Sequence, residues 1–170
     1  GGFEVLLGKK GCCGRPALSK GMLERASALA AENVRVLSAF ARDGVPIVGL
    51  EPSCILSFRD EYPDLVPGDD AKILAEHSFL LEELEGLALD FPEAPAKLLL
   101  HGHCHLKAIV GIEPLMAFLK KMGSDVQFVD AGCCGMAGSF GYEKEHFDIS
   151  LQMAERRLLP AVRDAPLDTV

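Results

Sequence analysis

Two pairs of adjacent cysteines, each flanked by glycines, are the residues of this sequence best suited to chemistry. The first pair lies in "GCCGRP" at 11–16 and the second in "GCCGMAGSFG" at 132–141. Consecutive side chains of an extended strand point to opposite faces, so both thiols of a pair reach one site only where the backbone turns. Glycine permits such a turn at little steric cost. The pattern therefore predicts two sharp turns that each present two sulfur ligands.

Adjacent thiols suit some metal groups better than others. A single tetrahedral zinc ion prefers ligands from C-x2-4-C knuckles, whereas thiolates are the normal ligands of iron–sulfur clusters, which contain several iron atoms. The sequence holds no C-x2-C-x2-C run, so an ordinary ferredoxin cubane is not indicated. The glycines of the second turn would let backbone N–H groups approach cluster sulfur atoms closely. The candidate cofactor-binding glycines are Gly132, Gly135 and Gly138.

The two remaining cysteines stand alone in the sequence. Cys54 follows Pro52 and Ser53 at the end of a predicted strand, and its position suits packing and ligation equally well. Cys104 lies in "HGHCH", whose histidines could bind zinc or orient thiolates through hydrogen bonds. If this segment continues the preceding strand, His101, His103 and His105 lie on the face opposite Cys104. We therefore expect most of these histidines not to bind a metal together with Cys104. His105, where the strand ends, stays a candidate ligand.

The elements that must position these cysteines alternate between strands and helices. Branched or aromatic runs bounded by glycine or proline predict buried strands at 3–7, 46–50, 97–101 and 125–129. Apolar spacing of three and four predicts helices at about 20–43, 69–85, 114–122 and 147–162. This order predicts an α/β fold with mainly parallel strands and flanking helices. Both cysteine pairs then follow carboxyl ends of strands, where functional loops gather.

An internal repeat relates the two cysteine pairs. Residues 2–14 align without gaps on residues 123–135, an offset of 123 minus 2, or 121 residues. The same offset moves Cys54 to position 175 and Cys104 to position −17, both outside the chain of 170 residues. The terminal "LDTV" also resembles the opening of a strand such as "PIVGL". We therefore expect a fragment of a longer polypeptide, with an N-terminally truncated repeat at 1–90 and a C-terminally truncated repeat at 91–170 in one compact domain.

Composition excludes several classes of partner. A chain of 170 residues with 49% hydrophobic residues can fill a core, so its six cysteines favour metal binding or redox chemistry over a disulfide framework. Its 25 acidic against 17 basic residues argue against nucleic-acid binding, which needs clustered lysine and arginine. No apolar run approaches the roughly 20 residues of a transmembrane helix. We expect a soluble, cytoplasmic protein, a location that also allows association with the inner face of the membrane.

A strand followed by GCCG, duplicated, with "EPSC" after the first copy and "HGHCHLK" before the second, resembles the cysteine-rich CCG domain. That domain occurs in heterodisulfide reductase and in iron–sulfur subunits of glycolate and lactate oxidation complexes. It also occurs at the carboxyl end of FAD-linked D-lactate dehydrogenases, which "CCGMAGSFGYE" resembles most. The resemblance implies two pseudo-symmetric α/β repeats with iron–sulfur clusters between strand ends, including the noncubane 4Fe-4S type.

The resemblance also implies ligands and a function. The metal ligands would be two sets of cysteines: Cys12, Cys13 and Cys54; Cys104, Cys133 and Cys134. The chain would transfer electrons toward a redox acceptor within a larger 2-hydroxyacid dehydrogenase of the D-lactate or glycolate type. FAD would bind to a partner domain of the same polypeptide, and no catalytic residue is expected here. Two alternatives stay open: a zinc-binding or metal-free interaction module, and a thiol–disulfide enzyme. The last is disfavoured because a vicinal disulfide is strained and no C-x-x-C is present.

Overall fold

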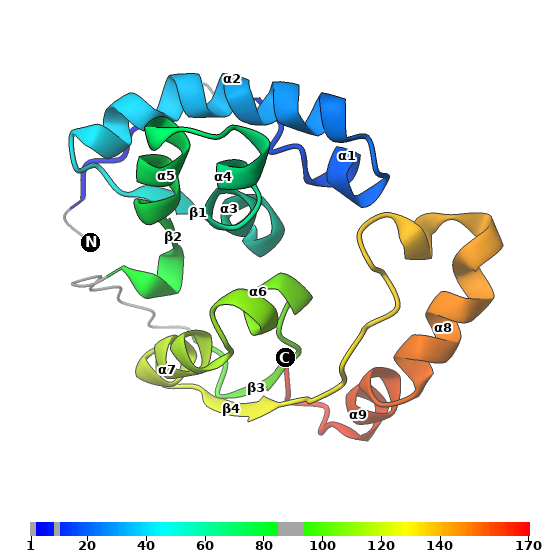
Figure 1. The fold of residues 1–170 in the computed structure, drawn as a ribbon. Helices are drawn as coiled ribbons and strands as arrows, with labels where there is room; N and C mark the ends of the chain where they lie inside the picture. Colours follow the sequence, from blue (N-terminus) through cyan, green and yellow to red (C-terminus); the bar gives the residue numbers. More distant parts are fainter. Residues whose placement is uncertain (1–2, 9–10, 85–93) are drawn as a thin grey trace. The chain divides into compact units, whose positions relative to one another are not determined.

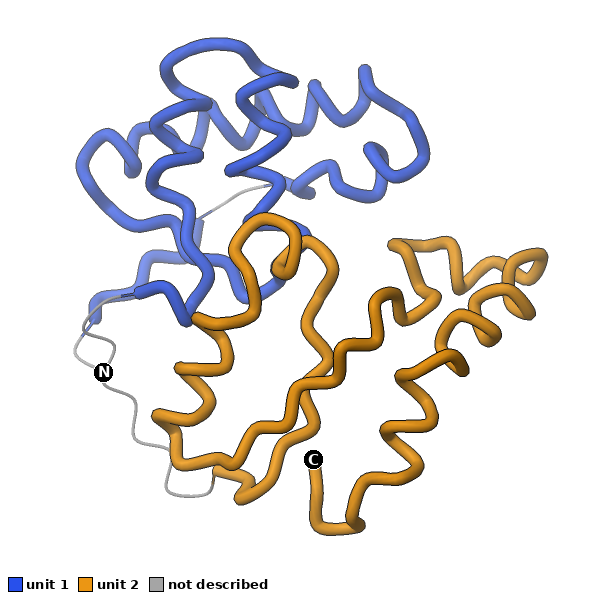
Figure 2. Tube along the Cα trace, turned by 60° about the horizontal axis from the view of Figure 1, so that its bottom comes forward, with its two compact units in different colours: residues 1–87 blue, residues 88–170 orange. Residues whose placement is uncertain are grey.

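The computed structural model describes residues 3–8, 11–84 and 94–170 (Figure 1). Two compact units make up the chain, residues 1–87 and residues 88–170 (Figure 2). Each unit contains one pair of short parallel strands with helices around it, which confirms a mixed α/β architecture with parallel strand pairing. The expected boundary between the repeats, at residue 90, lies outside the described residues.

Unit 1 is built around strands β1 (Ile47–Gly49) and β2 (Ser78–Leu80), which pair in parallel with Ile47 opposite Ser78. Its helical elements are α1 (Arg15–Ser19), α2 (Leu23–Arg42), α3 (Pro52–Arg59), α4 (Tyr62–Leu65), α5 (Asp69–Glu76) and the 3-10 turn η1 (Leu81–Glu83). The core gathers the apolar faces of α2, α3 and α5, with Leu56, Phe58 and Leu74 at most 1% exposed. Burying such side chains contributes roughly 1.5–3 kcal/mol each.

Helix α2 carries the longest apolar stripe of unit 1. Ala26, Ala30, Leu37 and Ala41 are all buried, as their spacing of three and four residues predicts. The predicted helix at 20–43 is therefore confirmed, except that it begins at Leu23 and is preceded by the short α1.

The strand predicted at 3–7 is wrong. Residues 3–8 adopt no regular secondary structure, and the side chains of Val5 and Leu7 are 75% and 93% exposed. A strand is stable only when a neighbouring strand satisfies its backbone groups. Among the described residues, β1 and β2 pair with each other and not with this segment. Its apolar composition predicted a strand, but composition carries no information on whether a partner is at hand.

The helix predicted at 69–85 is only half right. Helix α5 ends at Glu76, and β2 follows at once. Ser78 is 1% exposed, and its hydroxyl donates to the backbone oxygen of Leu74 at 2.7 Å. Leu80 is equally buried, and its N–H donates to the Glu83 carboxylate at 2.9 Å. Phe79 and Leu80 therefore belong to a strand of three residues, too short for its period to be read from the sequence, and Leu81 begins the 3-10 turn η1.

Unit 2 contains strands β3 (Lys97–Leu100) and β4 (Asp125–Phe128), paired in parallel with Lys97 opposite Asp125. Both strands were predicted. Its helical elements are α6 (Cys104–Ile109), α7 (Glu113–Lys121), η2 (Phe140–Tyr142), η3 (Lys144–His146), α8 (Phe147–Glu155) and α9 (Leu158–Asp164). Val170 accepts from the N–H of Leu99 at 2.8 Å and donates to the oxygen of Lys97 at 3.1 Å, the pair of bonds that a parallel strand makes.

The last predicted helix is divided in two. Helix α8 ends at Glu155 and α9 begins at Leu158, with Pro160 in its first turn. Proline lacks an N–H and its ring clashes with the carbonyl four residues earlier, so one continuous helix through 147–162 is disfavoured. Among the described residues, no helix has both the length and the apolar character that crossing a membrane requires.

Candidate metal centre

The first cysteine pair lies in a turn that enters α1. Gly14 has a φ of +86°, in the left-handed region where glycine is favoured. Cys12 is exposed, whereas Cys13 is 3% exposed, so the two adjacent thiols have different surroundings. The Sγ of Cys13 lies 2.9 Å from the Sγ of Cys54, 41 residues further along the chain. The structure therefore brings together two cysteines that the resemblance places in one ligand set.

Cys54 reaches this position through the junction between β1 and α3. The carboxylate of Glu51 caps α3 by accepting from the N–H of Ser53 at 3.1 Å, and Pro52 occupies the first turn. Cys54 lies in the same turn. Its position had suited packing and ligation equally well, and the structure places its sulfur against that of Cys13.

A buried hydrogen-bond network holds the backbone of the first cysteine turn. Asn33 and Tyr62 are both 0% exposed. The amide nitrogen of Asn33 donates to the backbone oxygen of Cys12 and to the Tyr62 hydroxyl, each at 2.9 Å. Its amide oxygen accepts from the N–H of Gly11 at 3.0 Å, and the Tyr62 hydroxyl donates to the backbone oxygen of Cys13 at 2.9 Å.

The pKa of the Tyr62 phenol is affected by all three cysteines of unit 1. Burial raises the pKa of Tyr62 well above its usual range, and its hydrogen bond with Asn33 partly opposes this. Cys13, Cys12 and Cys54 each raise the pKa of this phenol further. The hydroxyl therefore stays protonated and remains a donor even beside thiolates.

The positively charged side chain that follows the first cysteine turn, Arg15, is paired with a carboxylate. The partner is Glu61, and the charge of Arg15 is therefore already paired. Lys9 and Lys10 lie outside the described residues.

The second cysteine turn packs against α8. Gly135 has a φ of +90°, and a Cβ at this position would lie 2.2 Å from the backbone oxygen of Ser150. The N–H of Gly135 donates to the Sγ of Cys133 at 3.3 Å. Cys133 and Cys134 are both half-buried. Gly132 and Gly138 also have positive φ but are exposed.

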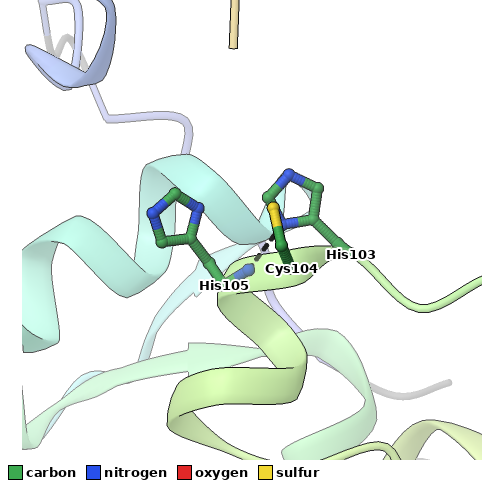
Figure 3. Close-up of side chains that lie close together, drawn as sticks. All are labelled: His103, Cys104 and His105. Carbon is green, nitrogen blue, oxygen red and sulfur yellow. Dashed lines mark hydrogen bonds between the residues drawn. The ribbon is translucent and has the colours of Figure 1, made fainter. Parts of the chain in front are cut away.

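Cys104 begins helix α6 and does not continue the strand (Figure 3). Strand β3 ends at Leu100, and His103 caps α6 by accepting the N–H of His105 on its Nδ1 at 3.2 Å. The ligand atoms of His103, Cys104 and His105 all lie within 4.8 Å of one another. The expectation that His103 lies on the face opposite Cys104 was wrong, because alternation applies to a strand and the segment is a helix start, whereas His105 had been left open as a ligand.

A lysine links α6 to the second cysteine turn. Lys107 lies three residues after Cys104 on α6, and its Nζ donates to the backbone oxygen of Gly132 at 2.7 Å. Residues three apart share one side of a helix, so Cys104 and Lys107 lie on similar sides of α6. Burial lowers the pKa of His101, and Lys107 and His103 add to this effect. The neutral imidazole is therefore favoured next to the lysine.

Sequence reasoning missed Asn33, Tyr62 and Lys107. One signal was present, because Asn33 falls among the buried positions of α2, between Ala30 and Leu37. A polar side chain on an apolar stripe must find partners, since burying it unpaired costs about 1–3 kcal/mol. The partners themselves are 21 to 29 residues away, and no local pattern identifies them.

Comparison with known proteins adds independent findings. A family model described as "Cysteine-rich domain" (CCG) matches residues 2–59 and 101–164. The chain is 31% identical over 153 residues to a subunit of the anaerobic glycerol-3-phosphate dehydrogenase of Escherichia coli K12, covering 85% of this chain and 38% of that protein. It is 31% identical over 159 residues to D-2-hydroxyglutarate dehydrogenase of Pseudomonas putida KT2440, covering 91% of this chain and 15% of that protein.

A third relative is lactate utilization protein A of an Exiguobacterium strain, 28% identical over 161 residues, covering 86% of this chain and 63% of that protein. The chain thus spans less than two thirds of each of these relatives. No solved structure matches it significantly. Because the family model matches more than half of the residues and covers both cysteine turns, the chain belongs to the CCG cysteine-rich domain family, as its motifs predicted.

Proposed function

We propose that the chain is an iron–sulfur electron-transfer domain of a larger FAD-dependent dehydrogenase that oxidises a 2-hydroxyacid of the D-lactate or glycolate type. The observation that carries this proposal is the approach of the Cys13 and Cys54 sulfur atoms to 2.9 Å across 41 residues of chain. The names of the relatives support it, because lactate, D-2-hydroxyglutarate and glycerol-3-phosphate each carry a secondary alcohol that a dehydrogenase can oxidise.

Thiolates are the ligands that such a cluster takes from a protein. All six cysteines are present as thiols. We assign the six thiols to two donor sets. The first set is Cys12, Cys13 and Cys54, and the second is Cys104, Cys133 and Cys134. When bound, an iron–sulfur cluster accepts and releases single electrons.

The other residues of the chain would prepare these thiols. Gly135 already donates an N–H to the Cys133 sulfur, and hydrogen bonds to cluster sulfur shift its potential. Gly132 and Gly138, beside the same turn, complete the glycines proposed to line the cofactor. The burial of Cys13 keeps water from its sulfur, which also affects the potential.

We further propose that the two cysteine turns belong to pseudo-symmetric repeats, residues 1–90 and 91–170, of one domain. Gly14 and Gly135, at the same position in the two copies, have φ values of +86° and +90°. The family model also matches each half once. The FAD-binding domain would lie elsewhere on the same polypeptide and pass electrons through this domain to a further acceptor.

Metal analysis tests the proposal. Anaerobically reconstituted protein, both as this chain and within the full-length polypeptide, should be brown and contain iron and acid-labile sulfide. Cys54→Ser should lose iron, whereas Ser53→Ala, the adjacent change that keeps the thiol, should retain it. Full iron content in Cys54→Ser, combined with an unchanged spectrum, would refute the ligand assignment.

A second candidate is a zinc site in unit 2. The observation that favours it is the clustering of His103, Cys104 and His105, because mixed nitrogen and sulfur ligands are typical of zinc. Under this alternative, purified protein should be colourless, contain stoichiometric zinc, and lose that zinc in His105→Ala. Iron in place of zinc would exclude it.

A further inference from the structure

Asn33 and Tyr62 form the most completely buried polar pair next to a candidate ligand in the described residues. Both side chains are 0% exposed. A buried amide inside a helix is costly unless its donors and acceptor are satisfied. Here the amide of Asn33 makes three hydrogen bonds, two of them to the backbone of residues 11 and 12. The side chain of Asn33 therefore stabilises the cysteine turn and not the helix to which it belongs.

The bonds form a directed chain. Because the Asn33 nitrogen donates to the Tyr62 oxygen, the hydroxyl proton of Tyr62 is left to donate to the Cys13 carbonyl. Successive bonds of this kind polarise and strengthen one another. One N–H and two carbonyls of three consecutive residues, 11 to 13, are thereby fixed.

The second cysteine turn is held in a different way. Among the described residues, the Lys107 ammonium donates to the backbone oxygen of Gly132 and the exposed Arg157 guanidinium to that of Asp130, while the N–H of Gly135 donates to the Cys133 sulfur. The buried amide is therefore a device of the first turn only.

We propose that Asn33 and Tyr62 are positioning residues for the first cysteine pair, fixing the backbone of residues 11–13 so that the Cys13 sulfur lies beside that of Cys54. This inference rests on the proposed function, in which these three thiols bind metal together. Residues that orient metal ligands in this way typically change metal affinity by about 10–100-fold when they are replaced.

Cobalt titration of the full chain tests the inference. The parent protein carries the changes Cys104→Ser, Cys133→Ser and Cys134→Ser, so that all thiolate-to-cobalt absorption arises from the first set. In this parent, Tyr62→Phe removes only the hydroxyl, and we expect it to weaken Co²⁺ binding about tenfold or more. The control is Ser78→Ala, which also removes one buried bond from a side chain to the backbone of unit 1, but away from the turn. It should leave Co²⁺ affinity unchanged.

Asn33→Leu, which keeps the approximate shape of the side chain, should weaken binding at least as much as Tyr62→Phe. If Asn33→Leu does not fold, Tyr62→Phe decides. Parental affinity in Tyr62→Phe, or an equal loss in Ser78→Ala, would overturn the inference.

Alkylation of the reduced, metal-free protein separates this inference from the proposed function. Iodoacetamide should modify exposed Cys12 much faster than buried Cys13, and in Tyr62→Phe the ratio of the two rates should fall toward one. In Ser78→Ala the ratio should remain that of the parent. A parent that binds no cobalt would refute the metal function, and this ratio would still decide whether the pair positions the thiols. An unchanged ratio in Tyr62→Phe refutes the positioning role.

Discussion

The contact between Gly135 and Ser150 allows a sharp comparison of two glycines in one turn. Gly132→Ala and Gly135→Ala both place an alanine at positive φ, at +66° and +90°. A Cβ at position 132 meets nothing within 4 Å, whereas a Cβ at position 135 would lie 2.2 Å from the Ser150 backbone oxygen. The two variants therefore share the conformational cost and differ in the steric one.

The magnitudes follow from these two terms. Left-handed backbone costs an alanine about 1–2 kcal/mol, and reduced freedom of the unfolded chain returns about 0.4–1 kcal/mol, so Gly132→Ala should cost about 1 kcal/mol. Forcing extra atoms into a packed contact costs a further 1–3 kcal/mol or so, which gives about 2–4 kcal/mol for Gly135→Ala. The difference of about 2 kcal/mol corresponds to roughly a 30-fold change in the unfolding equilibrium constant.

Urea unfolding of the 170-residue chain, followed by circular dichroism, measures both free energies. Equal losses in the two variants would show that the backbone of residue 135 does not approach α8 in solution. A larger loss in Gly132→Ala would also refute the reasoning, because position 132 has open space around it.

Two further predictions concern unit 1. Oxidised glutathione should convert the metal-free chain to a form with a Cys13–Cys54 disulfide, releasing two molecules of reduced glutathione, because the two sulfur atoms lie 2.9 Å apart. A peptide map should identify this disulfide. A map that joins Cys12 to Cys54 instead would contradict the geometry. Because burial raises the pKa of Tyr62, the unfolded chain loses this phenol's proton near pH 10 while the folded chain retains it, so stability should fall as the pH rises above about 10. In Tyr142→Phe, where all phenol absorbance comes from Tyr62, tyrosinate absorbance should rise only with loss of circular dichroism; a rise near pH 10 in the folded protein would show an accessible phenol.

The strands show what sequence patterns can and cannot predict. The runs at 47–49, 97–100 and 125–128 form strands because each pairs with a parallel neighbour. The run at 3–7 has the same composition, yet it is exposed and irregular. Local composition measures the tendency to form a strand, whereas pairing depends on segments distant in the sequence.

In the candidate site, too, some features could be predicted from the sequence and others could not. The cysteine pairs, their glycines and the proximity of Cys54 to the first pair followed from spacing and family resemblance. The orientation of "HGHCH" did not, because a histidine cap at His103 starts a helix where alternation suggested a strand. Asn33 and Tyr62 meet only in the folded chain, 29 residues apart, so a pattern of neighbouring residues could not reveal them.

The buried amide and phenol contact the first turn entirely through peptide groups, at the N–H of Gly11 and the carbonyls of Cys12 and Cys13. Every amino acid supplies the same carbonyl, so exchanging a thiol for another donor, such as imidazole or carboxylate, leaves these anchors intact. The scaffold and its ligand chemistry are therefore separable here. An engineer could change the donor atoms of this loop while its path through space is maintained by Asn33 and Tyr62, whose hydrogen bonds reach only its backbone.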